Sequence, residues 1–211
     1  MERQNFISAA YLLPHPPIIV PDIGKGQESK ADRTVKAMEK AAEEIVSLKP
    51  ETIVLLTPHA PLFRDSVFMY DSDKLKGDLS QFDSKLKLSF RQDSELREKI
   101  KDGLELNGIP AGTVPEYNHS IDHGAMVPLY FIASRYRSFK LVVLSPSGLA
   151  IRTLTEIGKI INASARELKR NMVLIASGDL SHKANLESPY GACKEGRLFD
   201  DEVIKHLSNN E

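Results

Sequence analysis

Residues 51–61 read ETIVLLTPHAP, and this short stretch carries both signals on which the fold prediction rests. Residues 51–56 form an apolar run of strand length, which is typical of a strand buried on both faces. Pro58 ends the run, because proline cannot donate to a ladder of strand hydrogen bonds, and His59 follows it at once. The same order of strand, proline and histidine recurs at residues 6–17, where the strand predicted at 6–13 stops at Pro14 and His15.

Outward from these junctions, apolar runs alternate with amphipathic segments. The pattern predicts strands at residues 6–13, 51–56, 66–70, 85–90, 139–144 and 172–176, and helices at 31–48, 93–106, 125–134, 154–168 and 197–207. Such alternation favours an α/β fold, a three-layer sandwich with a mixed, largely parallel central sheet flanked by helices. The strands between residues 66 and 90 are the reason to expect a mixed sheet. Residues 71–83 are predicted to form an exposed excursion, and Pro128 is expected in the first turn of its helix.

The organisation of the chain favours a single domain over residues 1–211, since no internal repeat, low-complexity tract or clear linker interrupts it. The helix predicted at 197–207 is followed by no closing strand. We therefore expect a domain that is truncated at its C-terminal end.

Composition excludes several classes of protein. The 28 Lys and Arg residues balance 29 Asp and Glu residues, so nothing attracts nucleic acid or an anionic membrane to the chain as a whole. A single cysteine, Cys193, rules out an intramolecular disulfide and a thiolate metal cage. The apolar runs are far shorter than the roughly 20 residues of a membrane-spanning helix. A reduced, cytoplasmic protein is the expectation.

Three of the six histidines, His15, His59 and His182, come within a few residues after a predicted strand. Ligands of open α/β sheets bind beyond the carboxyl ends of the strands, so parallel strands would bring these imidazoles to one edge of the sheet. Neutral imidazole binds Fe(II), Zn(II), Cu and Ni. Two histidines with one carboxylate form the facial triad of non-haem Fe(II) oxygenases. The flanking prolines would hold His15 and His59 at low entropic cost.

The remaining histidines divide into two groups. His123 directly precedes a buried helix, where Asp122 or a backbone carbonyl would fix its tautomer. His182 follows a glycine-containing turn, and an imidazole there can act as general base and later as general acid. His119 and His206 are expected to be ordinary surface residues.

Four motifs occur in order along nearly the whole chain: LLPHPP at 12–17, LTPHAP at 56–61, DHGAMVPL at 122–129 and SGDLSH at 177–182. With them the sequence resembles the class III extradiol ring-cleaving dioxygenase superfamily, typified by the catalytic subunit of protocatechuate 4,5-dioxygenase. Within that superfamily it is most similar to the dioxygenase-like domain of the AmmeMemoRadiSam system, a Memo-like branch.

The resemblance implies a role for each motif histidine. His15 and His59 take the positions of the metal ligands, and His182 that of the catalytic acid and base. His123 takes the position of a further catalytic histidine near substrate and O₂, and Asp179 would face the substrate or support the metal site. The implied cofactor is Fe(II), with Zn(II) or Cu as alternatives. The implied partners are an aromatic diol-like substrate, O₂ and a radical-SAM protein. A homo-oligomer is also expected, because loss of the strand pairing that the missing C-terminal segment normally supplies would expose a sheet edge.

The third ligand of the family, a glutamate, lies well beyond the SGDLSH motif and is not found here. Glu195, Glu202 and Glu211 are present but match no family motif. We therefore expect an incomplete facial triad in this 211-residue chain.

Two other functions stay open at this point. One is a non-oxygenase Memo-like protein that binds a metal or small ligand in a radical-SAM-associated modification pathway, since a shared fold does not fix function. The other is metal-assisted hydrolysis with His182 as the base. The identity of the third ligand distinguishes them, because glutamate favours iron and O₂ chemistry whereas cysteine or histidine favours copper or zinc.

Overall fold

The computed structural model describes residues 6–145, 148–184, 186, 188 and 190–209, so Glu211 lies outside the described residues. The chain divides into two compact units, Met1–Ser177 and Gly178–Glu211, and each is described here by itself. The expectation of a single domain stays a prediction. No helix in the described part of the chain is long and apolar enough to cross a membrane.

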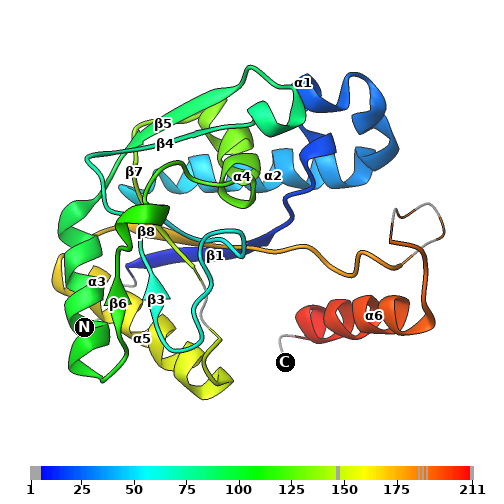
Figure 1. Cartoon of the computed structure of the whole chain (residues 1–211). Coiled ribbons are helices and arrows are strands. Elements are labelled where there is room, and N and C mark those ends of the chain that lie inside the picture. Colours follow the sequence, from blue (N-terminus) through cyan, green and yellow to red (C-terminus); the bar gives the residue numbers. More distant parts are fainter. Residues whose placement is uncertain (1–5, 146–147, 185, 187, 189, 210–211) are drawn as a thin grey trace. The chain divides into compact units, whose positions relative to one another are not determined.

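The first unit is organised around a four-stranded parallel sheet of order β1-β8-β2-β7 (Figure 1). Its strands are β1 (Ile7–Leu13), β8 (Met172–Ser177), β2 (Thr52–Leu56) and β7 (Lys140–Leu144). The strands end in register, since Leu13 pairs with Ser177 and Leu56 pairs with both Ala176 and Leu144. Residues that follow β1 and β2 therefore emerge at the same edge of the sheet as the end of β8.

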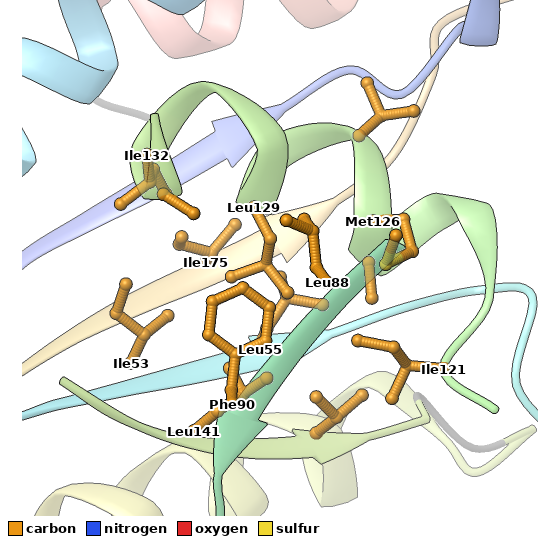
Figure 2. Close-up of a cluster of buried hydrophobic side chains, with 14 of the residues drawn as sticks. Ile53, Leu55, Leu88, Phe90, Ile121, Met126, Leu129, Ile132, Leu141 and Ile175 are labelled. Carbon is orange, nitrogen blue, oxygen red and sulfur yellow. The ribbon is translucent and has the colours of Figure 1, made fainter. Parts of the chain in front are cut away.

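Helices cover both faces of this sheet, which confirms the predicted α/β class with a mostly parallel central sheet flanked by helices (Figure 1). Side chains alternate along β2: Ile53 and Leu55 pack into one hydrophobic cluster, and Val54 packs into the other. Figure 2 shows the first cluster, where β2 residues meet Leu129 of α4 and Phe90. The covering helices are α2 (Asp32–Leu48) and α4 (His123–Ala133) on that face, and α3 (Ser94–Leu106) and α5 (Ile151–Glu167) on the opposite face.

The structure of residues 66–91 differs from the one predicted from the sequence, in which these strands join the central sheet. β3 (Val67–Phe68) pairs in parallel with β6 (Ala111–Gly112), and β4 (Lys74–Asp78) pairs antiparallel with β5 (Lys87–Arg91). These strands form two separate small sheets, and β4 lies where an exposed excursion was predicted. The alternation in β4 is short, with Leu75 and Gly77 buried and Lys74 and Lys76 exposed. A five-residue pattern of this kind is easily hidden by its polar neighbours.

Helix α4 begins two residues earlier than expected because Asp122 caps it. The Asp122 carboxylate accepts a hydrogen bond from the Ala125 amide at 3.2 Å. Pro128 therefore lies in the second turn of the helix, and the prediction that it occupies the first turn is wrong. Proline has no N–H, so the Gly124 carbonyl, four residues earlier, has no helical donor at position 128.

A charged network lies at the opposite, amino-terminal edge of the sheet. Asp93 is fully buried, caps α3 at the Leu96 amide (3.4 Å) and accepts the Thr52 hydroxyl at 2.5 Å. Its carboxylate also lies 3.2 Å from Nε of Arg170 and 3.7 Å from Nζ of Lys140. The network joins α3 to the start of β2 and β7 and to the segment that leads into β8.

The second unit contains α6 (Lys194–Asn209) and the segment that precedes it. Asp200 of α6 accepts a hydrogen bond from the Ser181 amide at 2.8 Å. Gly196 permits close packing, because a Cβ there would meet Ser181 Oγ at 2.6 Å and the Lys183 carbonyl at 2.7 Å. Within this unit, α6 thus holds the loop that carries His182.

Candidate metal site

Three histidines from separate segments of the first unit lie together at the carboxyl edge of the sheet. His15 follows β1, His59 follows β2 and His123 is the first residue of α4. One ring nitrogen from each lies within 4.8 Å of the other two. The ring centroids are 4.9 Å apart for His15 and His59, 5.6 Å for His15 and His123, and 4.0 Å for His59 and His123.

His15 is the most deeply placed of the three, with 4% of its surface exposed. Its Nδ1 lies 2.8 Å from the Ser177 hydroxyl at the end of β8. Ser177 in turn donates to the Gly124 carbonyl of α4 at 2.5 Å. The other nitrogen of His15, Nε2, lies 3.0 Å from Nε2 of His59.

His59 is positioned by a short polar chain that leads to the start of α4. Its amide donates to the Thr57 hydroxyl oxygen at 3.3 Å, and that hydroxyl donates to Asp122 at 2.6 Å. Gly124 lets the helix approach closely, since a Cβ there would meet Thr57 Oγ1 at 2.6 Å, Asp122 Oδ1 at 2.9 Å and His59 Cδ2 at 3.0 Å. The turn after β2 and the first turn of α4 therefore fit together only with glycine at position 124.

His123 is held from its other side by the segment between β4 and β5. Phe82 makes an edge contact with the His123 ring at 5.3 Å between centroids. The Gln81 amide nitrogen lies 3.5 Å from His123 Nδ1. Gln81 and Phe82 belong to a short 3-10 helix, Ser80–Phe82, within the segment 71–83 that the sequence predicts only as an exposed excursion.

The donor set fits a divalent metal of the imidazole-binding group. All three donors are nitrogens, which suits Fe(II), Zn(II), Cu or Ni and not the oxygen-preferring Ca²⁺ or Mg²⁺. Two nitrogens bound to one ion at about 2.0–2.1 Å lie roughly 3 Å apart, and the Nε2 atoms of His15 and His59 are 3.0 Å apart. These two histidines present their nitrogens at a separation that a metal ion can bridge.

A cleft of about 560 Å³ opens beside His59. Phe63 and Tyr117 lie next to each other in its wall, in edge contact with ring centroids 6.4 Å apart. The cleft is lined by the segment from His59 to Phe63, by Tyr70, and by Glu116, Tyr117, His119, Ser120 and Asp122. His119 is exposed, as expected of a surface residue, but it lines the same cleft as a predicted metal ligand. Its sequence context gave no signal of this.

Tyr70 carries the clearest electrostatic perturbation in the cleft. Burial raises the pKa of its phenol well above the ordinary value of 10.0, and the negative charge of Asp122 raises it further. The Tyr70 hydroxyl donates to the Ser120 carbonyl at 3.3 Å. Asp122 Oδ2 is buried and has no hydrogen-bond partner among the described residues. The cleft thus keeps a protonated phenol next to a carboxylate.

The other two predicted site residues, Asp179 and His182, belong to the second unit. His182 Nε2 lies 3.8 Å from the Asp179 carboxylate, and its ring makes an edge contact with Tyr190 at 5.6 Å between centroids. Their predicted roles at the histidine cluster stay predictions. The structure brings together His15, His59 and His123 within one unit.

Comparison with known proteins adds to this geometry. A family profile described as the catalytic LigB subunit of aromatic ring-opening dioxygenase matches residues 9–211. "Protein CA_C1420" of Clostridium acetobutylicum is 36% identical over 211 residues, which cover 96% of this chain and 45% of that protein. The "4,5-DOPA dioxygenase extradiol" of Beta vulgaris is 27% identical over 182 residues, which cover 82% of this chain and 65% of that protein. The chain therefore spans less than two thirds of either relative.

Proposed function

The chain belongs to the family of catalytic LigB subunits of aromatic ring-opening dioxygenases, and from that premise we propose that it is a metal-dependent extradiol dioxygenase for a catechol-like diol. Extradiol cleavage breaks the ring carbon–carbon bond beside the diol and places both atoms of O₂ in the product, so it needs no external reductant. The observation that carries the proposal is the convergence of His15, His59 and His123 at the edge where ligands of parallel sheets bind.

His15 and His59 are the proposed metal ligands, with Fe(II) as the metal and Zn(II) or Cu as the alternatives. When bound, the metal would supply coordination of the diol oxygens and activation of O₂. The 3.0 Å separation of the two Nε2 atoms supports this assignment. The prolines flanking both histidines limit the backbone freedom that binding would otherwise remove.

The remaining site residues are proposed to act on the substrate. His123 would face the diol and exchange a proton with it, and His182, supported by Asp179, would serve as the acid and base of ring opening. The cleft beside His59 would hold the aromatic ring against Phe63 and Tyr117, which line its wall. Aromatic walls next to a polar floor at Tyr70 and Asp122 suit a flat ring that carries hydroxyl groups.

A second candidate function follows from the nitrogen-only donor set. If His123 acts as a third ligand, the set of three imidazoles suits Zn(II) or Cu as well as Fe(II). The chain would then be a non-oxygenase metal-binding protein of the Memo-like kind, with a radical-SAM protein as its functional partner. This alternative differs from the first in one measurable respect, since it predicts metal binding without consumption of O₂.

The experiment is metal reconstitution followed by an oxygen-uptake assay. The chain is loaded anaerobically with Fe(II) or with Zn(II), and the His15→Ala/His59→Ala double variant is treated in parallel. Near-stoichiometric metal in the parent only, with catechol-dependent uptake of O₂ and two ¹⁸O atoms in the product, supports the dioxygenase. Stoichiometric metal without uptake across a catechol panel supports the second candidate. Equal metal content in parent and variant contradicts both.

A further inference from the structure

The Gly124 carbonyl occupies an unusual position in α4. In a regular helix it would accept the N–H of residue 128, but that residue is Pro128 and has no N–H. The proline ring also crowds the carbonyl of the residue four positions before it, which turns that carbonyl away from the helix axis. The Gly124 carbonyl is therefore available to a donor outside the helix, and the Ser177 hydroxyl donates to it at 2.5 Å.

The Ser177 hydroxyl has a second polar contact, and its single proton cannot be donated to both partners. His15 Nδ1 lies 2.8 Å from the same hydroxyl oxygen. A serine hydroxyl has one proton to donate and lone pairs with which to accept, whereas a carbonyl oxygen can only accept. Both contacts are hydrogen bonds only if Ser177 donates to Gly124 and His15 Nδ1 carries a proton that it donates to Ser177. The reverse arrangement would set two oxygens against each other at 2.5 Å without a proton between them.

We propose that Ser177 is a positioning residue that fixes His15 in the Nδ1–H tautomer, and that Pro128 makes this possible by freeing the Gly124 carbonyl. The neutral imidazole then carries its lone pair on Nε2, the nitrogen that lies 3.0 Å from His59 Nε2. His15 and Ser177 are both buried, so water does not compete with the chain of hydrogen bonds. The tautomer that can bind a metal is thus set before any metal arrives.

The arrangement also orders the site mechanically. It joins the segment after β1, the last residue of β8 and the first turn of α4, three parts of the chain that are far apart in sequence. A hydrogen bond to the distal nitrogen of a ligating histidine typically changes metal affinity by about 10–100-fold. The proposal rests on the proposed function only for this effect on metal affinity, because the tautomer itself can be measured without metal.

The first arm of the test is ¹H–¹⁵N NMR of metal-free, histidine-labelled protein at about pH 8, where an ordinary imidazole is neutral. His15 is assigned by loss of its signals in His15→Gln. The expected result is a proton on Nδ1 and an unprotonated Nε2. A proton on Nε2, or rapid averaging between the two tautomers, overturns the proposal. This arm needs no variant of Ser177 and no activity.

The second arm compares Ser177→Ala with Ser145→Ala. Ser145 is a matched control, because it is also a buried serine at the carboxyl end of a central strand. It directly follows β7, whereas Ser177 is the last residue of β8, and it accepts a hydrogen bond from the Phe68 amide at 3.3 Å. Ser177→Ala should lose the fixed tautomer and weaken Zn(II) affinity by about 10–100-fold, while Ser145→Ala changes neither. An unchanged tautomer in Ser177→Ala overturns the proposal.

The two arms separate this inference from the proposed function. An Nδ1–H tautomer in a parent protein that binds no metal supports the inference and contradicts the proposed function. Stoichiometric metal binding in a parent protein whose His15 is protonated on Nε2 contradicts the inference and is consistent with the proposed function.

Discussion

The imidazole rings of His59 and His123 lie 4.0 Å apart between centroids at an angle of 41°, although one follows strand β2 and the other begins helix α4. The chain brings them together through the hydrogen bond from Thr57 to Asp122, since Thr57 precedes His59 by two residues and Asp122 directly precedes His123. The residue that caps α4, Asp122, therefore also holds the two site histidines close to each other.

Replacement of either proposed ligand should remove the metal and leave the fold intact. His15→Ala and His59→Ala should lower bound Fe(II) or Zn(II) from near one equivalent to background, because two donors at most would remain. Metal analysis after gel filtration measures the content, and circular dichroism checks the fold. His206→Ala in α6 is the control and should bind metal like the parent. Parent-like metal content in both ligand variants would refute the assignment.

His123→Ala distinguishes a catalytic histidine from a third ligand. If His123 exchanges a proton with the substrate, the variant should keep its metal and lose about 10²–10⁴-fold in turnover. We expect this outcome. If His123 instead completes the donor set, metal content should fall as it does for His15→Ala. Metal analysis and oxygen uptake on the same sample measure both quantities.

Gly124→Ala should damage the site through packing alone. The added Cβ would lie 2.6 Å from Thr57 Oγ1 and 3.0 Å from His59 Cδ2, so the turn after β2 must move. We expect a loss of about 1–3 kcal/mol in the free energy of unfolding and weaker metal binding. The control is Gly158→Ala in α5, where a Cβ meets nothing within 4 Å and should stabilise by roughly 0.5–1 kcal/mol. Equal stability of the two variants would contradict the close packing inferred for Gly124.

Tyr70 should contribute a pH dependence on the alkaline side. Its pKa is raised in the folded state above the ordinary value of 10.0, so above that pH the unfolded chain loses this proton while the folded protein keeps it. The stabilisation is fully present below about pH 10 and is lost as pH rises further, by up to about 1.4 kcal/mol per pH unit. Denaturant unfolding of Tyr70→Phe between pH 8 and 11 should show a shallower alkaline decline than the parent. Parallel curves for parent and variant would show that Tyr70 does not titrate in this way.

Much of the fold could be predicted from the sequence because its signals are local. Continuous apolar runs such as residues 52–56 indicate buried parallel strands, and the proline after each of two strands marks where His15 and His59 emerge. Parallel strands then bring their carboxyl ends to one edge, which is where the structure has both histidines.

The parts that could not be predicted depend on contacts between distant segments. Ser177 reads as an ordinary strand-end serine until His15 and Gly124 are seen on either side of it. Pro128 fits a first turn until the capping contact of Asp122 shows where α4 begins. In the same way, β4 is stabilised by its pairing with β5 more than by the propensity of its own residues.

The buried Asp93 network lies at the end of the sheet away from the histidines, and this separation has a consequence for protein engineering. Breaking one partner of a buried charged network typically costs about 3–5 kcal/mol, so this end is a strong determinant of thermal robustness. It shares no residue with the histidine cluster, and substitutions without shared partners combine almost additively. Substitutions that change stability around Asp93 and substitutions that change the site around His59 can therefore be selected separately and then combined.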